Sequence, residues 1–167
     1  MAFREISVEE LKDNPFTLIN KDWMLITAGN REKHNTMTAS WGGVGELWGR
    51  YVSTIYIRPQ RYTLEFVERE DYYSLCFFGP EYRQALNLCG SKSGREIDKD
   101  AATGLTPCFD EAAPYYEQAR LVFLCRKLYR QDLEEGSFLD KGLLEKWYDN
   151  DLHRMFIGEI VKVLEKE

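Results

Sequence analysis

The residues best suited to chemistry form an uncharged polar block at positions 35–43, with the sequence NTMTASWGG. Its hydroxyl and amide side chains and its free backbone N–H groups supply many neutral hydrogen bonds in a short stretch. Its small side chains allow a flat ligand to approach the backbone closely. An isoalloxazine ring needs such a site, with hydrogen bonds along its carbonyl and nitrogen edge and a flat or apolar surface against its faces. The block is equally consistent with an ordinary strand that has a polar outer face.

A second block, RPQRYT at positions 58–63, contains two arginines where a predicted strand gives way to a predicted helix. The first N–H groups of the helix, its dipole and the side chains of Arg58 and Arg61 could converge on a phosphate. Taken alone, the block is also explained by a basic, solvated turn. Together the two blocks supply the two halves of a mononucleotide site, and a predicted strand connects them.

Other charged positions are weaker candidates. The segment SKSGR at 91–95, with Lys99 just beyond it, could contact an anion or a ring edge, although a flexible charged loop explains most of it. Lys127 and Arg130 are predicted to be solvated charges at the end of a strand. His153 could protonate a substrate, but we predict a surface position for it.

The glycines in GVGELWG, at positions 43–49, do not predict a dinucleotide site. In the dinucleotide fingerprint a helix begins at the glycines, so that its N-terminus faces the pyrophosphate. Here the sequence leads directly into a β-prone run at 51–57. The glycines are therefore predicted to form a hairpin or a flexible loop between two strands.

The elements that must position these residues are mostly strands. A capping box of Ser7 and Glu10 predicts an N-terminal helix that ends at Asn14-Pro15. Strands are predicted at 23–28, 36–41, 51–57, 72–78, 119–130 and 154–164, the last interrupted at Gly158, and helices at 60–70, from Pro80 to Gly90, and at 98–104. There is no regular βα alternation. The pattern predicts a mostly β fold, an antiparallel barrel decorated with helices, in a single domain spanning residues 1–167.

The composition excludes several classes of protein. A hydrophobic fraction of 44% and an aromatic fraction of 14% argue against disorder. A net charge of −6 argues against nucleic-acid or anionic-membrane binding by the chain as a whole. No apolar run is long enough to span a bilayer and no signal-peptide core is evident, so a cytoplasmic location is expected. The four widely spaced cysteines predict reduced, inert thiols and no metal site.

Three motifs in order resemble the flavin reductase-like family, which includes flavoredoxin and flavin-dependent ferric reductase. They are NTMTASWGG (35–43), YIRPQRYT (56–63) and SGR (93–95), and the resemblance extends from about Trp23 to Leu164. It implies a split β-barrel that binds flavin mononucleotide (FMN) non-covalently. It also implies a homodimer with the flavin near the subunit interface.

The resemblance assigns site residues one by one. It places the flavin against Asn35, Thr36, Met37, Thr38, Ser40 and Trp41, and it places the ribityl chain and phosphate against Tyr56, Arg58, Arg61 and Thr63. Lys99 is expected to approach the ring or the phosphate. The two-component monooxygenase reductases carry a DPP-like turn where this chain has Arg58-Pro59-Gln60, so their supply of free flavin to a partner oxygenase is not carried over.

The expected function is that of an FMN-dependent oxidoreductase, a flavin reductase-like enzyme that takes electrons from NAD(P)H and serves a small-molecule or protein redox partner. The flavin would supply the electron chemistry, so no catalytic side chain is assigned. NAD(P)H would stack over an exposed flavin face, because no separate dinucleotide domain is evident. The alternative is a flavoredoxin-like electron carrier without NAD(P)H activity of its own. A third hypothesis is a barrel that no longer binds flavin, but the intact polar block at 35–43 and the intact arginine block at 58–63 argue against it.

Overall fold

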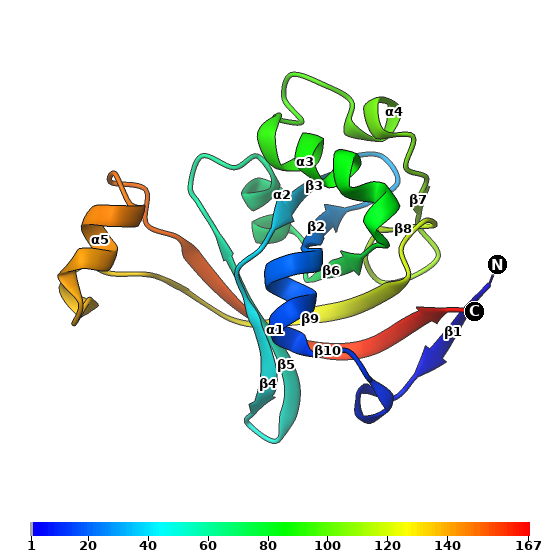
Figure 1. The fold of residues 1–167 in the computed structure, drawn as a ribbon, viewed down its shortest axis with the longest axis horizontal. Coiled ribbons are helices and arrows are strands. Elements are labelled where there is room, and N and C mark those ends of the chain that lie inside the picture. The colour runs from blue at the N-terminus through cyan, green and yellow to red at the C-terminus, as the bar shows by residue number, and fades with distance from the viewer. Residues whose placement is uncertain (1) are drawn as a thin grey trace.

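One antiparallel sheet organises the computed structural model, which describes residues 2–167 (Figure 1). Its strands follow the order β3-β2-β6-β9-β10-β5-β4, and β1 pairs with the C-terminal end of β10. Their bounds are β1 Phe3–Ile6, β2 Met24–Gly29, β3 His34–Ala39, β4 Gly43–Leu47, β5 Arg50–Ile57, β6 Tyr72–Phe77, β9 Leu121–Asp132 and β10 Arg154–Lys166. A separate pair joins β7 Pro107–Cys108 to β8 Tyr115–Tyr116. No ladder joins β3 to β4 within residues 2–167, so the sheet is not closed.

Short helices decorate this sheet, as the sequence predicts. They are α1 Pro15–Thr17, α2 Thr63–Arg69, α3 Arg83–Ser91, α4 Lys99–Thr103 and α5 Lys141–Trp147, with single turns η1 Val8–Glu10, η2 Leu18–Asp22, η3 Pro80–Tyr82 and η4 Glu135–Ser137. Helix α2 packs on β2, and α3 packs on β3. None of the helices in the described part of the chain is long and apolar enough to cross a membrane.

The core has two parts, one on each side of β2. Ile26 belongs to the cluster inside the barrel with Phe123 and Phe156, whereas Leu25 belongs to the cluster beneath α3 with Leu86. Successive side chains of a strand point to opposite faces, so a strand covered on both faces must be apolar throughout. This explains why the run at 23–28 shows no polar alternation.

Gly158 marks an irregularity in β10. The register of β10 against β9 shifts between Ile157 and Gly158. A Cβ at Gly158 would lie 2.8 Å from Cζ of the buried Tyr73, whose hydroxyl is 2.8 Å from Ser53 Oγ. The glycine is therefore required for the close approach of β10 to Tyr73.

The N-terminal helix predicted from Ser7 to Asn14 was wrong in extent. The capping box exists, since Glu10 accepts from the Ser7 N–H, but only the single turn η1 follows it. Phe3–Ile6 instead forms β1, because pairing with β10 satisfies its backbone groups. Asn14 caps α1, which begins at Pro15 rather than ending there.

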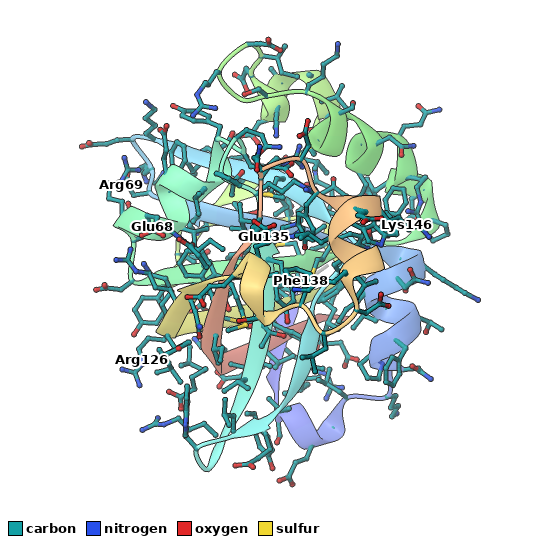
Figure 2. All side chains as sticks on the ribbon, turned by 90° about the vertical axis from the view of Figure 1, so that its left-hand side faces the viewer. Glu68, Arg69, Arg126, Glu135, Phe138 and Lys146 are labelled. Carbon is teal, nitrogen blue, oxygen red and sulfur yellow. The ribbon has the colours of Figure 1, made fainter. Side chains whose placement is uncertain are left out.

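A segment for which the sequence predicted no helix or strand projects from the body of the molecule. Residues 133–153, between β9 and β10, contain η4 and α5 and are called the arm below. In Figure 1 the arm extends away from the sheet, on the side opposite to the two termini. Figure 2 views it end-on, with Glu135 and Phe138 at η4 and Lys146 on α5 in front of the sheet.

Candidate functional site

A pocket of about 390 Å³ lies where β3, the end of β5, the C-terminal part of α3 and the residue before β10 meet. It is called the main pocket below, because most of the predicted site residues line it. It collects seven of the predicted site residues, namely Met37, Thr38, Ser40, Trp41, Tyr56, Arg58 and Arg61. Its other lining residues are Ala39, Gln60, Gly90 and His153. The structure thus brings together side chains from both sequence blocks, and β5 connects them as expected.

Contacts between β3 and α3 form the floor of this pocket. The Thr38 hydroxyl donates to the Leu86 carbonyl of α3. Gly90 lies so close to the strand that a Cβ there would be 3.2 Å from Thr38 Cβ. Arg61 donates from Nη1 to the Gly90 carbonyl at 2.8 Å and from Nη2 to the Thr38 carbonyl at 3.4 Å. One guanidinium therefore joins the helix end to the strand.

Arg61 also gives the pocket a positive charge without a carboxylate partner. Among residues 2–167 its donors reach only backbone carbonyls, and it takes part in no ion pair within 4.0 Å. Burial lowers the pKa of Arg61, and the nearby charge of Arg58 lowers it further. A guanidinium remains protonated even so. A half-buried cation of this kind is stabilised by an anionic ligand.

Lys99 is a second cation with no acidic partner within ion-pair distance in the described chain. Its Nζ donates to the Thr36 carbonyl at 2.6 Å and to the Cys89 carbonyl, near the C-terminal end of α3, at 3.0 Å. Burial lowers the pKa of Lys99 to about 8, and the Arg61 charge contributes. The two carbonyls and the negative end of the helix dipole favour the ammonium form and offset part of this effect.

Four predicted site residues lie outside the main pocket. Asn35, Thr36 and Lys99 border a neighbouring pocket of about 290 Å³, and Thr63 is 1% exposed. Asn35 Nδ2 donates to Thr63 Oγ1 at 2.9 Å, and Thr36 Oγ1 lies 2.8 Å from Thr27 Oγ1. The hydrogen bonds of these side chains therefore tie β3 to β2 and to the start of α2, away from the main pocket.

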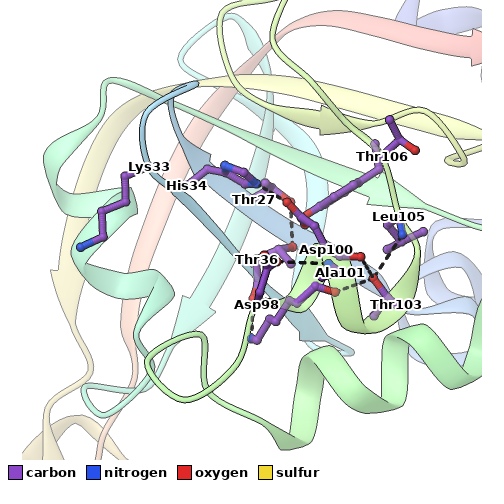
Figure 3. A network of polar contacts seen from close by, with 12 residues as sticks. Thr27, Lys33, His34, Thr36, Asp98, Asp100, Ala101, Thr103, Leu105 and Thr106 are labelled. Carbon is purple, nitrogen blue, oxygen red and sulfur yellow. Dashed lines mark hydrogen bonds and ion pairs between the residues drawn. The ribbon is translucent and has the colours of Figure 1, made fainter.

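The neighbouring pocket contains its own polar network, shown in Figure 3. Nε2 of His34 lies 2.7 Å from Asp100 Oδ2, and the Tyr116 hydroxyl donates to Asp100 Oδ1 at 2.8 Å. These hydrogen bonds lower the pKa of Asp100 against the opposing effect of its burial. The network ties the β2–β3 hairpin to α4 and thereby fixes the N-terminal end of β3.

Arg58 lines the main pocket, but its guanidinium is engaged by the arm. Nη1 donates to Asp151 Oδ2 at 2.9 Å, and Nη2 donates to the Trp147 carbonyl at 3.0 Å. Its Cζ also lies 4.9 Å from the centre of the Tyr148 ring. The phosphate contact predicted for Arg58 therefore competes with three contacts that already exist.

Comparison with known proteins accounts for this arrangement. The model of the flavin reductase like domain matches residues 17–167. The chain belongs to this family. No protein with a curated function matches the sequence.

Solved structures confirm the split barrel fold. A Shewanella frigidimarina protein described as having a split barrel domain is 19% identical, covers 100% of this chain and 81% of its own, and has a TM-score of 0.70. Flavoredoxin of Desulfovibrio vulgaris is 21% identical, with 98% and 78% covered and a TM-score of 0.68. An NADH:FAD oxidoreductase of Streptomyces globisporus is 14% identical, with 87% and 74% covered and a TM-score of 0.63. At these identities the likeness establishes the fold alone.

His153 is the pocket residue of this flavin reductase-like chain that sequence reasoning missed. The predicted surface position was wrong, because its side chain is buried with an exposed fraction of 6%. Its ring centre lies 5.5 Å from that of Trp41, and its Nδ1 is 2.7 Å from the Tyr148 hydroxyl. Burial lowers the pKa of His153 to about 4, and the Arg58 charge contributes. The imidazole is therefore neutral at pH 7. The available signal was its place directly before the apolar last strand.

The weaker charged candidates of the sequence, one in a loop and two on β9, have other partners in this family member. Arg95 donates from Nη2 to Glu65 at 2.7 Å and lies 4.4 Å above the Tyr62 ring. Lys127 donates to the Glu68 carbonyl at 3.0 Å, and Arg130 pairs with Glu68. The charge of Arg95 is thus already compensated, in contrast to that of Arg61.

Proposed function

We propose that this flavin reductase-like chain is an oxidoreductase that binds FMN non-covalently in the pocket between β3, α3 and the start of β10, and that it oxidises NAD(P)H. Family membership supports a flavin. The choice of FMN rests on the pocket. FMN combines a flat ring system with a phosphate, and the pocket combines uncharged polar and aromatic walls with one uncompensated cation.

The observation that carries this proposal is the isolation of Arg61. The carbonyls of Thr38 and Gly90 fix its position in advance, and an arginine that is already held in place loses less conformational freedom when it binds a phosphate. Lys99 adds positive charge from beneath β3. In this assignment Met37, Thr38, Ser40, Trp41 and Tyr56 hold the ring and the ribityl chain.

The remaining residues orient ligands and exclude water. Bound FMN would supply the hydride and electron chemistry, which no side chain of the pocket provides. Neutral His153 is held by Tyr148 at Nδ1. If the phenol donates this bond, the imidazole proton is on Nε2, the nitrogen for which the structure gives no other partner. The Trp41 ring packs beside the His153 imidazole and gives this side of the pocket an aromatic surface.

The alternative is an electron carrier of the flavoredoxin type, and one observation favours it. Trp41, which lines the pocket, and Trp147 of the arm are 40% and 43% exposed, and their ring centres are 5.0 Å apart. An exposed aromatic edge beside a redox site suits electron exchange with a protein partner.

A homodimer is also part of the proposal, and sedimentation of the purified protein tests it separately.

The decisive test is the visible spectrum of the protein purified without added flavin and then titrated with FMN. We expect a bound-flavin spectrum that bleaches on anaerobic addition of NADH or NADPH. A flavin spectrum that persists with both donors would favour the electron carrier. A protein that takes up no FMN would refute the proposal.

A further inference from the structure

The arm has no core of its own to hold it. Helix α5 contains no buried residue, and the Leu139 side chain is 99% exposed. A segment with so little buried apolar surface is held in place by its contacts with the rest of the chain. The nature of these contacts therefore decides where the arm lies.

The arm's contacts with the body converge on the main pocket. Arg58 donates to Asp151 and to the Trp147 carbonyl, and Gln60 Nε2 donates to the same Asp151 oxygen at 3.1 Å. The rings of Trp147 and Trp41 meet edge to face with centres 5.0 Å apart. On the body side, Arg58, Gln60 and Trp41 all line the pocket.

We propose that the arm is a movable wall of the flavin pocket, that Arg58 is the positioning residue that holds it, and that Trp147 determines access of ring-bearing electron donors or acceptors to the pocket. The inference rests on the proposed function for its ligand. Of the arm's residues, His153 lines the pocket itself, whereas Trp147 contacts the pocket residue Trp41 and Tyr148 contacts His153. Aromatic walls favour flat ring compounds through stacking and edge contacts.

Electrostatics favour this role for Arg58 over phosphate binding. Asp151 accepts from the Asp149 N–H at 2.8 Å as well as from Gln60 and Arg58, and these bonds lower the pKa of Asp151 to about 2. The carboxylate is therefore ionised at neutral pH and compensates the charge of Arg58. A phosphate at Arg58 would have to displace this partner, whereas Arg61 has none to displace.

The position of the arm can be measured in the flavin-free protein through tryptic cleavage after Lys141 and Lys146. Asp151→Asn and Arg58→Lys each weaken the charged hydrogen bonds, so we expect cleavage about 10-fold faster or more. The double variant should be cleaved more slowly than the product of the two single effects predicts, because both substitutions weaken the shared Arg58–Asp151 pair. The matched control is Arg4→Lys, which weakens an exposed pair with Glu165 far from the arm and should leave the rate unchanged. Unchanged cleavage in Asp151→Asn, with circular dichroism intact, would overturn the inference.

A second measurement separates the positioning role from phosphate binding. If Arg58 positions the arm, Arg58→Met and Asp151→Asn should retain the preference for FMN over riboflavin. If Arg58 binds the phosphate, Arg58→Met, which removes the charge, should reduce that preference and Asp151→Asn should increase it, which would refute the positioning role.

Access through the wall is tested by collisional quenching of bound flavin fluorescence with acrylamide. Trp147→Ala should raise the quenching constant, whereas Leu139→Ala, at an exposed arm position away from the pocket, should not. Equal constants in wild type and Trp147→Ala would show that the arm does not control access. A protein without flavin would refute the proposed function but would leave the cleavage result intact.

Discussion

Removing the charge of Arg61 should weaken FMN binding far more than riboflavin binding. The two flavins differ only in the phosphate, and Arg61 is the pocket cation that lacks a carboxylate partner within the described chain. A charged hydrogen bond contributes about 1.5–3 kcal/mol. We therefore expect Arg61→Met to raise the Kd for FMN about 10- to 150-fold. The Kd for riboflavin, which carries no phosphate, should rise by a much smaller factor.

The assay is fluorescence titration of the flavin-free protein with each ligand. Because Arg61 also joins Gly90 to Thr38, Arg61→Lys serves as a second variant that keeps the charge and should bind FMN more tightly than Arg61→Met. Arg95→Met is the matched control, since Glu65 already compensates that charge, and it should change FMN binding little. Equal weakening of FMN and riboflavin in a folded Arg61→Met protein would refute a phosphate contact.

Three further predictions concern groups buried near the site or in the core. The midpoint of His153 protonation, followed by NMR, should lie near pH 4, and a midpoint near 6.5 would contradict its burial. Because the pKa in the folded protein is below the usual 6.5, the free energy of unfolding should fall as the pH drops from 6.5 to 4. The loss is at most about 3 kcal/mol, at ~1.4 kcal/mol per tenfold change in proton affinity. Because the pKa of Lys99 is lowered to about 8, the free energy of unfolding should rise between pH 8 and 10, and this rise should be absent in Lys99→Met. Urea denaturation at each pH measures both proteins, and parallel pH profiles would count against the lowered pKa. Gly158→Ala should destabilise the protein by about 1–3 kcal/mol in the same denaturation assay at pH 7, because the added Cβ would press on the Tyr73 ring. An unchanged urea midpoint would mean that β10 can shift to accept the methyl group.

Local sequence patterns were sufficient for most strands and for the polar blocks. The β-branched and aromatic run at 51–57 forms β5, and the apolar run at 23–28 forms most of β2. Pro80 begins the turn that precedes α3, and Asp98 caps α4. These features depend on interactions within a few residues, and such interactions are visible in a single sequence.

The failures occurred where distant segments decided the outcome. Phe3–Ile6 became a strand because β10 offers an open edge to it. Thr63, predicted at the phosphate, is buried, and its hydroxyl accepts from Asn35, which lies 28 residues earlier. His153 reads as a surface residue in sequence, and only the packing of Trp41 against it makes it a pocket residue.

The sequence by itself determined six of the strands, the two polar blocks and, through its motifs, membership of the flavin reductase like family. The tertiary structure decided which of the two arginines of the second block has a carboxylate partner. Arg58 and Arg61 stand three positions apart in one motif, yet the arm supplies Asp151 to the first, whereas within residues 2–167 the donors of the second reach only backbone carbonyls. Asp151 lies 93 residues from Arg58 along the chain, and charge compensation depends on distance in space rather than on separation in sequence.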